Sequence, residues 1–220
     1  MSTTTVSQLA FGSVINPVGG SLGDGSQTPM IAGRGGDHLV SEVHGRFYQM
    51  AYRGNVFHAR SPVAGSVIPT NSATAQTFAV LNPAGSNVNL ELLQVKIDIS
   101  ATSTYVAAEI YLNAVNGTPL AVLLGGTCTV IAGGVQNAFL VQGNNPKSTA
   151  YSAVTSVSQA DKHICGMGSF DVVSTSVGFH ITRNIDGGII VPQGTIIFFT
   201  GTAAQTSIAH IDVMYAEVPI

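Results

Sequence analysis

Asn82-Pro-Ala-Gly-Ser-Asn-Val-Asn-Leu-Glu-Leu-Leu-Gln-Val-Lys-Ile-Asp-Ile-Ser100 is the stretch that decides the fold, because a turn signal leads directly into a long alternating run. From residue 93 to Ile99 every second residue is apolar, and polar residues occupy the other phase. This period of two belongs to a β-strand with one buried face, whereas a helix needs a spacing of 3.6. Pro83 and Gly85 indicate a turn before it. We therefore expect a central strand around which the others are arranged.

The phase of this alternation reverses at Leu92-Leu93. Val88, Leu90 and Leu92 share one phase, and Leu93 begins the opposite one. Such a step indicates either a β-bulge or a strand that is covered on both faces at its start. Both interpretations place this strand inside the fold.

The composition favours a protein that works in an assembly. Charged residues make up 9% of the 220 residues, against about a quarter in ordinary soluble proteins. Small and uncharged residues take their place, so other subunits can cover the surface at little desolvation cost. We predict a homotrimer, because a lone sandwich of this composition would leave apolar surface exposed.

The sequence does not favour nucleic-acid binding, secretion through a signal peptide or insertion into a membrane. The formal net charge of −3 gives no support to nucleic-acid binding. Residues 1–10 have no positive region and no long apolar core, so we expect no signal peptide, and no apolar run is long enough to cross a membrane. Arg34, Arg46, Arg53 and Arg60 make the first part mildly basic, which fits either an anionic partner surface or ordinary solvated side chains.

The two cysteines, Cys128 and Cys165, lie in apolar runs that resemble strands. We expect buried free thiols that act by packing, with a single disulfide as the alternative. Two cysteines are too few for a metal site of the cysteine type.

Residues 1–36 are predicted to form an extended N-terminal arm, and residues 37–220 a β-sandwich body. The arm is too rich in glycine and small polar residues to form a core of its own. Single apolar residues nevertheless recur along it, which suits a segment that becomes ordered against another surface; a disordered leader is the alternative. The residues expected to anchor it are Leu9, Phe11, Val14, Ile15, Met30, Ile31 and Arg34.

The body is predicted to be all-β, an antiparallel β-sandwich and in particular a jelly roll. Turn signals include Asn116-Gly117, Gly143–Ser148, Asn184–Gly188 and the Pro-x-Gly of Val191–Gly194. No stretch predicts a long helix. The expected strands lie within 40–60 (broken at Gly45 and at 53–55) and at 76–82, 93–100, 104–113, 119–124, 127–131, 136–142, 150–157, 163–173, 177–183, 188–191, 195–200 and 207–217.

Candidates for catalysis are few, and we predict no enzyme, no cofactor and no metal site. His163 and Cys165 are strand neighbours that could form a nucleophile and base on one face, but such spacing is common. His180 and His210 are interpreted as sheet residues with partners in the sheet. The carboxylates Glu91, Asp98 and Glu109 have no spacing that fixes a glycosidase geometry.

A sugar-binding face normally presents exposed aromatic rings, and this chain has no Trp. We expect its Tyr and Phe side chains, where they alternate in strands, to lie in the core. Asn116-Gly-Thr118 matches a glycosylation acceptor, but the hairpin turn is the preferred interpretation.

The chain resembles proteins of tailed-bacteriophage particles in four short segments: Gly45–Tyr48, Tyr52–Phe57, Asn82–Leu93 and Val191–Ile196. The resemblance implies a virion structural protein of jelly-roll type, similar to the decoration or cement proteins that sit as trimers on the capsid exterior. It further implies the major capsid protein as partner. Nucleic acid and a membrane are not expected as partners, because of the net charge and the short apolar runs described above. The expected location is the capsid exterior after assembly in the host cytoplasm. No catalytic residues follow from it.

A tail or fibre component that contacts the host is the main alternative. Fibre modules usually carry coiled-coil or repeat segments before the head, and none is visible in this sequence.

Overall fold

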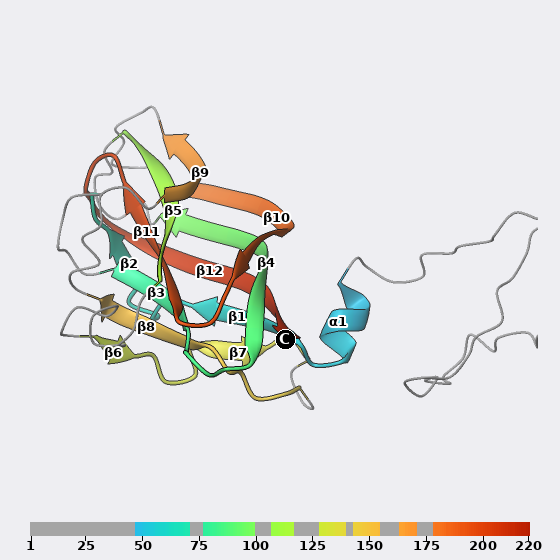
Figure 1. The fold of residues 1–220 in the computed structure, drawn as a ribbon. Coiled ribbons are helices and arrows are strands. Elements are labelled where there is room, and N and C mark those ends of the chain that lie inside the picture. Colours follow the sequence, from blue (N-terminus) through green and yellow to red (C-terminus); the bar gives the residue numbers. More distant parts are fainter. Residues whose placement is uncertain are drawn as a thin grey trace, which may run out of the picture. The chain divides into compact units, whose positions relative to one another are not determined.

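The computed structural model describes residues 47–70, 77–99, 107–116, 128–139, 143–154, 163–170 and 178–220. All of them belong to one unit, Phe47–Ile220. Two antiparallel sheets face each other (Figure 1), and the predicted all-β sandwich is confirmed. The jelly-roll version of that prediction stays a prediction.

The first sheet has six strands in the order β10-β4-β12-β1-β7, with β2 paired to β12. Its strands are β1 (Val56–Arg60), β2 (Ser66–Ile68), β4 (Val88–Ile99), β7 (Val135–Asn137), β10 (Phe179–Val191) and β12 (Gln205–Pro219).

The second sheet has the order β6-β8-β3-β11-β5-β9. Its strands are β3 (Thr77–Asn82), β5 (Ala108–Asn116), β6 (Thr129–Val130), β8 (Thr149–Val154), β9 (His163–Phe170) and β11 (Thr195–Gly201).

The main core fills the space between the sheets. Along β12, which contains the strand expected at 207–217, the odd-numbered residues from Ala209 to Tyr215 are buried in this core. Phe57 of β1 stacks on Tyr215 with ring centroids 6.1 Å apart. Among the described residues, the large side chains that are almost completely buried are Tyr215, Phe57, Phe78, Phe198, Phe199, Ile68, Leu81, Leu90, Leu92, Leu93, Ile97 and Ile110.

The phase step in β4 is a β-bulge, which was one of the two interpretations of the sequence. On β12, Met214 pairs with Gln94 and Tyr215 with Leu92, so Leu93 is the extra residue. The bulge turns Leu93 away from the main core while Leu92 stays inside.

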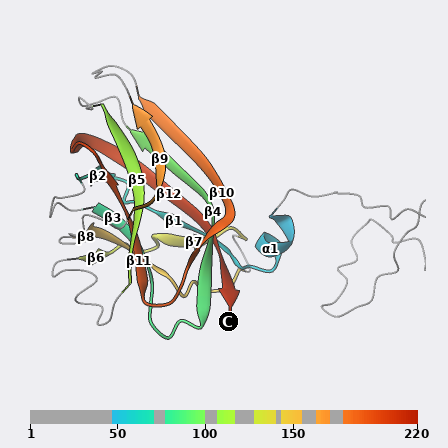
Figure 2. The same ribbon diagram turned by 45° about the horizontal axis from the view of Figure 1, so that its top comes forward.

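Leu93 is buried in a small separate cluster beneath a short helix, α1 (Tyr48–Tyr52). Figures 1 and 2 both place α1 close to the C-terminal end of β12. Phe47, Met50 and Ala51 pack against Val56, Leu93 and Ala216.

The prediction of a strand between Gly45 and residue 52 was wrong, because residues 48–52 are helical. Five residues cannot sustain a helix by propensity, so contact with the cluster around Leu93 must stabilise this turn.

The predicted turn at Asn184–Gly188 is a wide bulge inside the continuous strand β10. Pairing with β4 breaks after Asn184 and resumes at Ile189. Asp186 and Gly187 have positive φ angles of 56° and 81°, the backbone conformation that turn residues adopt. The chain nevertheless does not reverse its direction here. A Cβ at Gly187 would collide with the carboxylate of Glu91.

The second sheet is covered on both faces over β3 and β11, as the continuous apolar runs of these strands indicate. Their residues are all buried. Alternate side chains enter the main core, and the others, such as Leu81 and Phe198, form a second cluster on the opposite face.

The two turns quoted in the resemblance lie side by side. The buried amide of Asn82 donates to the carbonyls of Val88 at 2.9 Å and Val191 at 3.0 Å. Gly85 N–H in turn donates to Gln193 Oε1 at 2.8 Å. Asn82 thus joins the end of β3 to the start of β4 and the end of β10.

Some predictions lie outside the described residues. They include the arm and its boundary near residue 36, all seven proposed anchoring residues, and the connection after Asn116 with its predicted strand at 119–124.

Candidate interaction surface

The first sheet has an outer face, turned away from the core, whose polar end lies on β10, β4, β12 and β1. Strand register places His180, Asp98 and His210 in one row across three neighbouring strands. The next row contains Thr182, Lys96, Asp212 and Arg60. The alternation of β4 predicts this, because Lys96 and Asp98 occupy its polar phase.

Basic side chains and carboxylates pair at this end of the face. His58 Nδ1 lies 3.1 Å from one carboxylate oxygen of Asp212, and Arg60 Nε lies 3.6 Å from the other. His180 contacts Asp98 and also lies 2.6 Å from the hydroxyl of Thr182. This end therefore combines cations and carboxylates in a compensated pattern.

The other end of the outer face carries exposed apolar side chains. Ile190 on β10 is 61% exposed, Val218 on β12 is 38% exposed, and the terminal Ile220 is 69% exposed. Ile190 lies opposite Glu91, which in turn lies opposite Ala216, so these residues share the face that α1 partly covers. Ile190 belongs to the strand expected at 188–191, and its exposure was not predicted.

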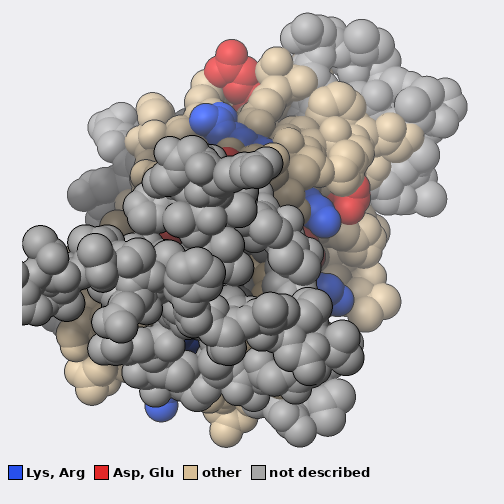
Figure 3. Space-filling model, turned by 90° about the vertical axis from the view of Figure 1, so that its right-hand side faces the viewer, with Lys and Arg blue, Asp and Glu red and all other residues tan. Residues whose placement is uncertain are grey.

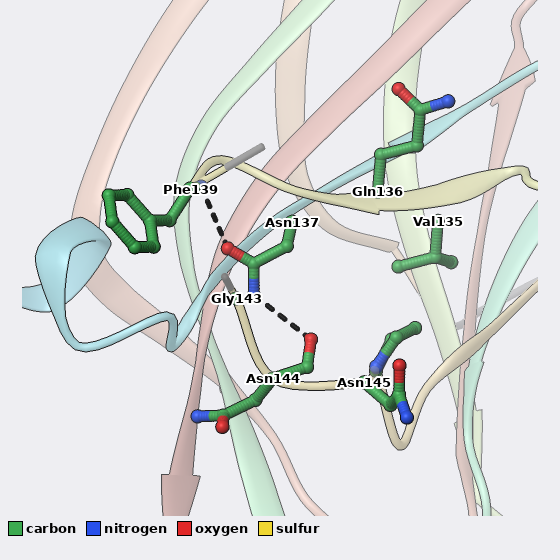
Figure 4. Close-up of a pocket in the computed structure, with 8 residues that line it drawn as sticks. Val135, Gln136, Asn137, Phe139, Gly143, Asn144 and Asn145 are labelled. Atoms are coloured by element: carbon green, nitrogen blue, oxygen red, sulfur yellow. Dashed lines mark hydrogen bonds between the residues drawn. The ribbon is translucent and has the colours of Figure 1, made fainter. Parts of the chain in front are cut away.

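A hollow of about 420 Å³ lies beside β7, the edge strand of the first sheet. Its lining comes from Val135, Gln136, Asn137 and Phe139 and from the segment Gly143–Pro146, and none of the lining side chains is charged. Figure 4 shows the side chain of Asn137 pointing from β7 toward Asn144. In the sequence, Asn144-Asn145-Pro146 indicated a surface loop. It did not indicate that β7 would lie opposite this loop and form the other side of the hollow.

Aromatic side chains stand at one end of this hollow. Phe139 contributes to the lining, and Tyr52 of α1 packs on it with ring centroids 5.7 Å apart and planes at 57°. Tyr48 stacks on Tyr52 at 5.8 Å. Tyr48 and Tyr52 are 39% and 48% exposed, so the expectation that Tyr side chains lie in the core was wrong for these two. The unpredicted helix α1 brings them to the surface.

The same loop is held from below by a buried carboxylate. Glu217 Oε1 accepts from the backbone N–H groups of Lys147 at 2.8 Å and Ser148 at 3.0 Å, and from the Ser148 hydroxyl at 2.9 Å. The hydroxyls of Ser148 and Tyr215 also contact each other. Burial raises the pKa of the Tyr215 phenol far above its ordinary value, although the contact with Ser148 lowers it.

The structure separates His163 from Cys165, so the expectation that both point to one face was wrong. Pairing between β5 and β9 slips by one residue between them. His163 stacks on Tyr111 with centroids 5.0 Å apart, whereas Cys165 packs against the main core. Burial raises the pKa of the Cys165 thiol and Arg183 lowers it, and the net shift is upward, which disfavours the thiolate.

Cys128 and Cys165 are free, and each is half-buried where full burial was expected. Cys165 packs against the main core and Cys128 against the cluster on the far face of the second sheet.

The candidate carboxylates do not meet. Glu91 and Asp98 lie on β4 of the first sheet, while Glu109 lies on β5 of the second and accepts a hydrogen bond from Tyr111. That hydrogen bond, together with desolvation, raises the pKa of Tyr111. His180 has Asp98 and Thr182 as partners. Within the described ranges, no three His, Cys, Asp or Glu side chains are grouped so that they could hold a metal ion.

Among the described residues that Figure 3 shows, a few basic and acidic side chains stand among uncharged ones. No helix in the part of the chain described here has the length and apolar character needed to cross a membrane.

Comparisons with known proteins gave no match: no family model, no curated protein and no solved structure is significantly similar to this chain.

Proposed function

We propose that this protein is a virion structural protein that decorates and stabilises a bacteriophage capsid by binding the outer shell between capsomers. It works as a homotrimer on the capsid exterior, and its partner is the major capsid protein. The proposal assigns it no enzymatic activity.

The observation that carries the proposal is the outer face of the first sheet. One end presents the exposed aliphatic residues Ile190 and Val218, and the other presents charges that compensate one another. Protein interfaces combine an apolar part with a polar, solvent-accessible part, and the two ends of this face supply one of each. The low overall charge lets such a face be covered by protein at little desolvation cost.

The connectivity supports the jelly-roll part of the proposal. The chain passes between the sheets at each step from β3 to β4 to β5, and again from β10 to β11 to β12. Jelly rolls build their two sheets by this kind of alternation.

The proposed arm, residues 1–36, anchors the trimer to the shell. Burying apolar residues such as Leu9, Phe11, Val14 and Ile15 contributes about 1.5–3 kcal/mol each before ordering entropy is subtracted. Met30, Ile31 and Arg34 extend the contact. Three arms per trimer act together, so avidity makes the attachment strong.

Cosedimentation with capsid shells that lack this protein tests the proposal. The full chain should pellet with the shells, and a chain beginning at Asp37 should remain folded and trimeric but bind much more weakly. Equal binding by both would assign anchoring to the body, and absence of binding by the full chain would contradict decoration.

A tail or fibre component that contacts the host is the second candidate. The exposed Tyr48 and Tyr52 beside an uncharged hollow favour it, because such a site suits recognition of a surface ligand. Electron microscopy of the particle distinguishes the two by locating the subunit on head or tail.

A further inference from the structure

The hollow beside β7 offers main-chain hydrogen-bonding groups that its sheet does not use. Ala138 N–H donates to Val56 O and Arg60 N–H to Gly134 O, both at 2.8 Å. In an antiparallel ladder, alternate residues of an edge strand direct their N–H and C=O groups away from the neighbour. On β7 those residues are Val135 and Asn137, and both line the hollow.

The far wall of the hollow is held in place by Asn137 and Asn144. Asn137 Nδ2 donates to Gly54 O at 2.6 Å and to Asn144 O at 3.1 Å, while its Oδ1 accepts from Phe139 N–H at 2.8 Å. Asn144 Nδ2 donates to Asn55 Oδ1 at 2.9 Å. Figure 4 shows the hydrogen bond from Asn137 to Asn144, which joins β7 to the loop. The wall is therefore preorganised.

The side-chain amide of Asn145 is available to form hydrogen bonds with a ligand. It lines the hollow and is exposed, and its side chain has no hydrogen-bond partner among the described residues. An amide supplies two donors and an acceptor. Together with the main chain of Val135 and Asn137, it presents uncharged donors and acceptors within one hollow.

The aromatic end completes the site. Tyr52 packs on Phe139, which lines the hollow, and stacks on Tyr48, yet it is 48% exposed, so an exposed part of this aromatic cluster adjoins the hollow. A ligand that reaches from the hollow to Tyr52 needs hydroxyl groups at one end and an apolar surface at the other.

We propose that this hollow binds a neutral saccharide, with Asn145 and the main chain of β7 contacting its hydroxyls and Tyr52 packing against a sugar ring. A charged ligand would find no charged side chain in the lining, and an apolar ligand would leave the amides unpaired. A hollow of about 420 Å³ has the size of a small-ligand site. The inference does not rest on capsid decoration.

Saturation-transfer-difference NMR on the full chain tests it, with galactose, maltotriose and chitotriose as neutral probes and sialic acid as the anionic one. At least one neutral probe should receive saturation at its ring protons. Asn145→Ala should weaken its binding about fivefold, as expected for one lost hydrogen bond, and Tyr52→Ala should weaken it by a similar factor.

Asn184→Ala and Tyr111→Ala are the matched controls, because these residues lie on other strands, β10 and β5, and do not line the hollow. Both should bind like the unaltered chain, and thermal unfolding checks that all four variants are folded. The proposal is overturned if no neutral probe binds, if sialic acid binds best, or if folded Asn145→Ala and Tyr52→Ala bind as tightly as the controls.

Discussion

Glu217 holds Ser148 through two hydrogen bonds, one from the backbone N–H at 3.0 Å and one from the hydroxyl at 2.9 Å. The carboxylate is only 6% exposed. A buried carboxylate is costly unless it is hydrogen-bonded, and here the loop supplies the donors. Glu217 therefore fixes the segment that forms one wall of the hollow.

Glu217→Gln should lower the free energy of unfolding by about 2 kcal/mol, because hydrogen bonds to a charged acceptor are lost and an amide N–H₂ is turned toward other donors. Urea unfolding followed by circular dichroism measures this. Glu109→Gln, at an exposed position, is the control and should change stability much less. Equal losses in the two variants would contradict the role given to Glu217.

Tyr215 should make the protein sensitive to alkaline pH. Burial raises its pKa in the folded state, so the proton stays on the folded protein and is lost from the unfolded chain above about pH 10. Its contribution is fully present below that pH and decreases as pH rises, by up to about 1.4 kcal/mol per unit. Tyr215→Phe should lose less stability between about pH 9 and pH 11 in denaturant titrations. Parallel losses in both proteins would contradict this.

Leu93→Ala should cost about 2–3 kcal/mol, because the side chain is 1% exposed and supports α1 from below. Exchange of the Ala51 amide, which donates to Phe47 O at 2.9 Å, should become faster as the helix loosens. Val63→Ala is the control: this side chain is 98% exposed, and the change should stay within about 0.5 kcal/mol. Unchanged exchange at Ala51 in the Leu93 variant would show that α1 is held by other contacts.

Leu92 and Leu93 show which features could be predicted from the sequence. A bulge moves side chains from one face of a strand to the other, so the reversed phase of these two adjacent residues indicated it without knowledge of the neighbouring strands. The residues that cover Leu93 could not be predicted in this way, because they are far from it in the sequence. Helix α1 forms because Leu93 and Ala216 lie beneath it, and these residues are distant along the chain.

The hollow could not be predicted for the same reason. Asn137 and Asn144 are close in sequence, but their amides are fixed by Gly54 and Asn55, more than eighty residues earlier. Likewise, the turn character of Asp186 and Gly187 was correct as backbone conformation, but only pairing with β4 shows that β10 continues through it.

Cys165 should react slowly with a disulfide reagent near neutral pH in the folded protein and rapidly after unfolding, because burial raises its thiol pKa. Cys128→Ala isolates this thiol for the measurement. Substituting either cysteine with Ala should cost only modest stability, since both act by packing. Mass spectrometry of the unreduced protein that found a quantitative bridge between them would contradict this prediction.

The proposed homotrimer leads to a prediction about Ile190. Its side chain is 61% exposed on the isolated chain, so Ile190→Asp should leave the fold of the single chain intact. If the apolar end of the outer face is covered in the trimer, the same change buries an unpaired carboxylate and should shift the equilibrium toward monomers. Light scattering at micromolar concentration measures the mass. The unaltered protein should have three times the mass of one chain, and the Ile190→Asp variant should have a lower mass. Val63→Asp, equally charged but in the turn before β2, should stay trimeric, whereas a stable monomer in the unaltered protein would remove the trimer from the proposal.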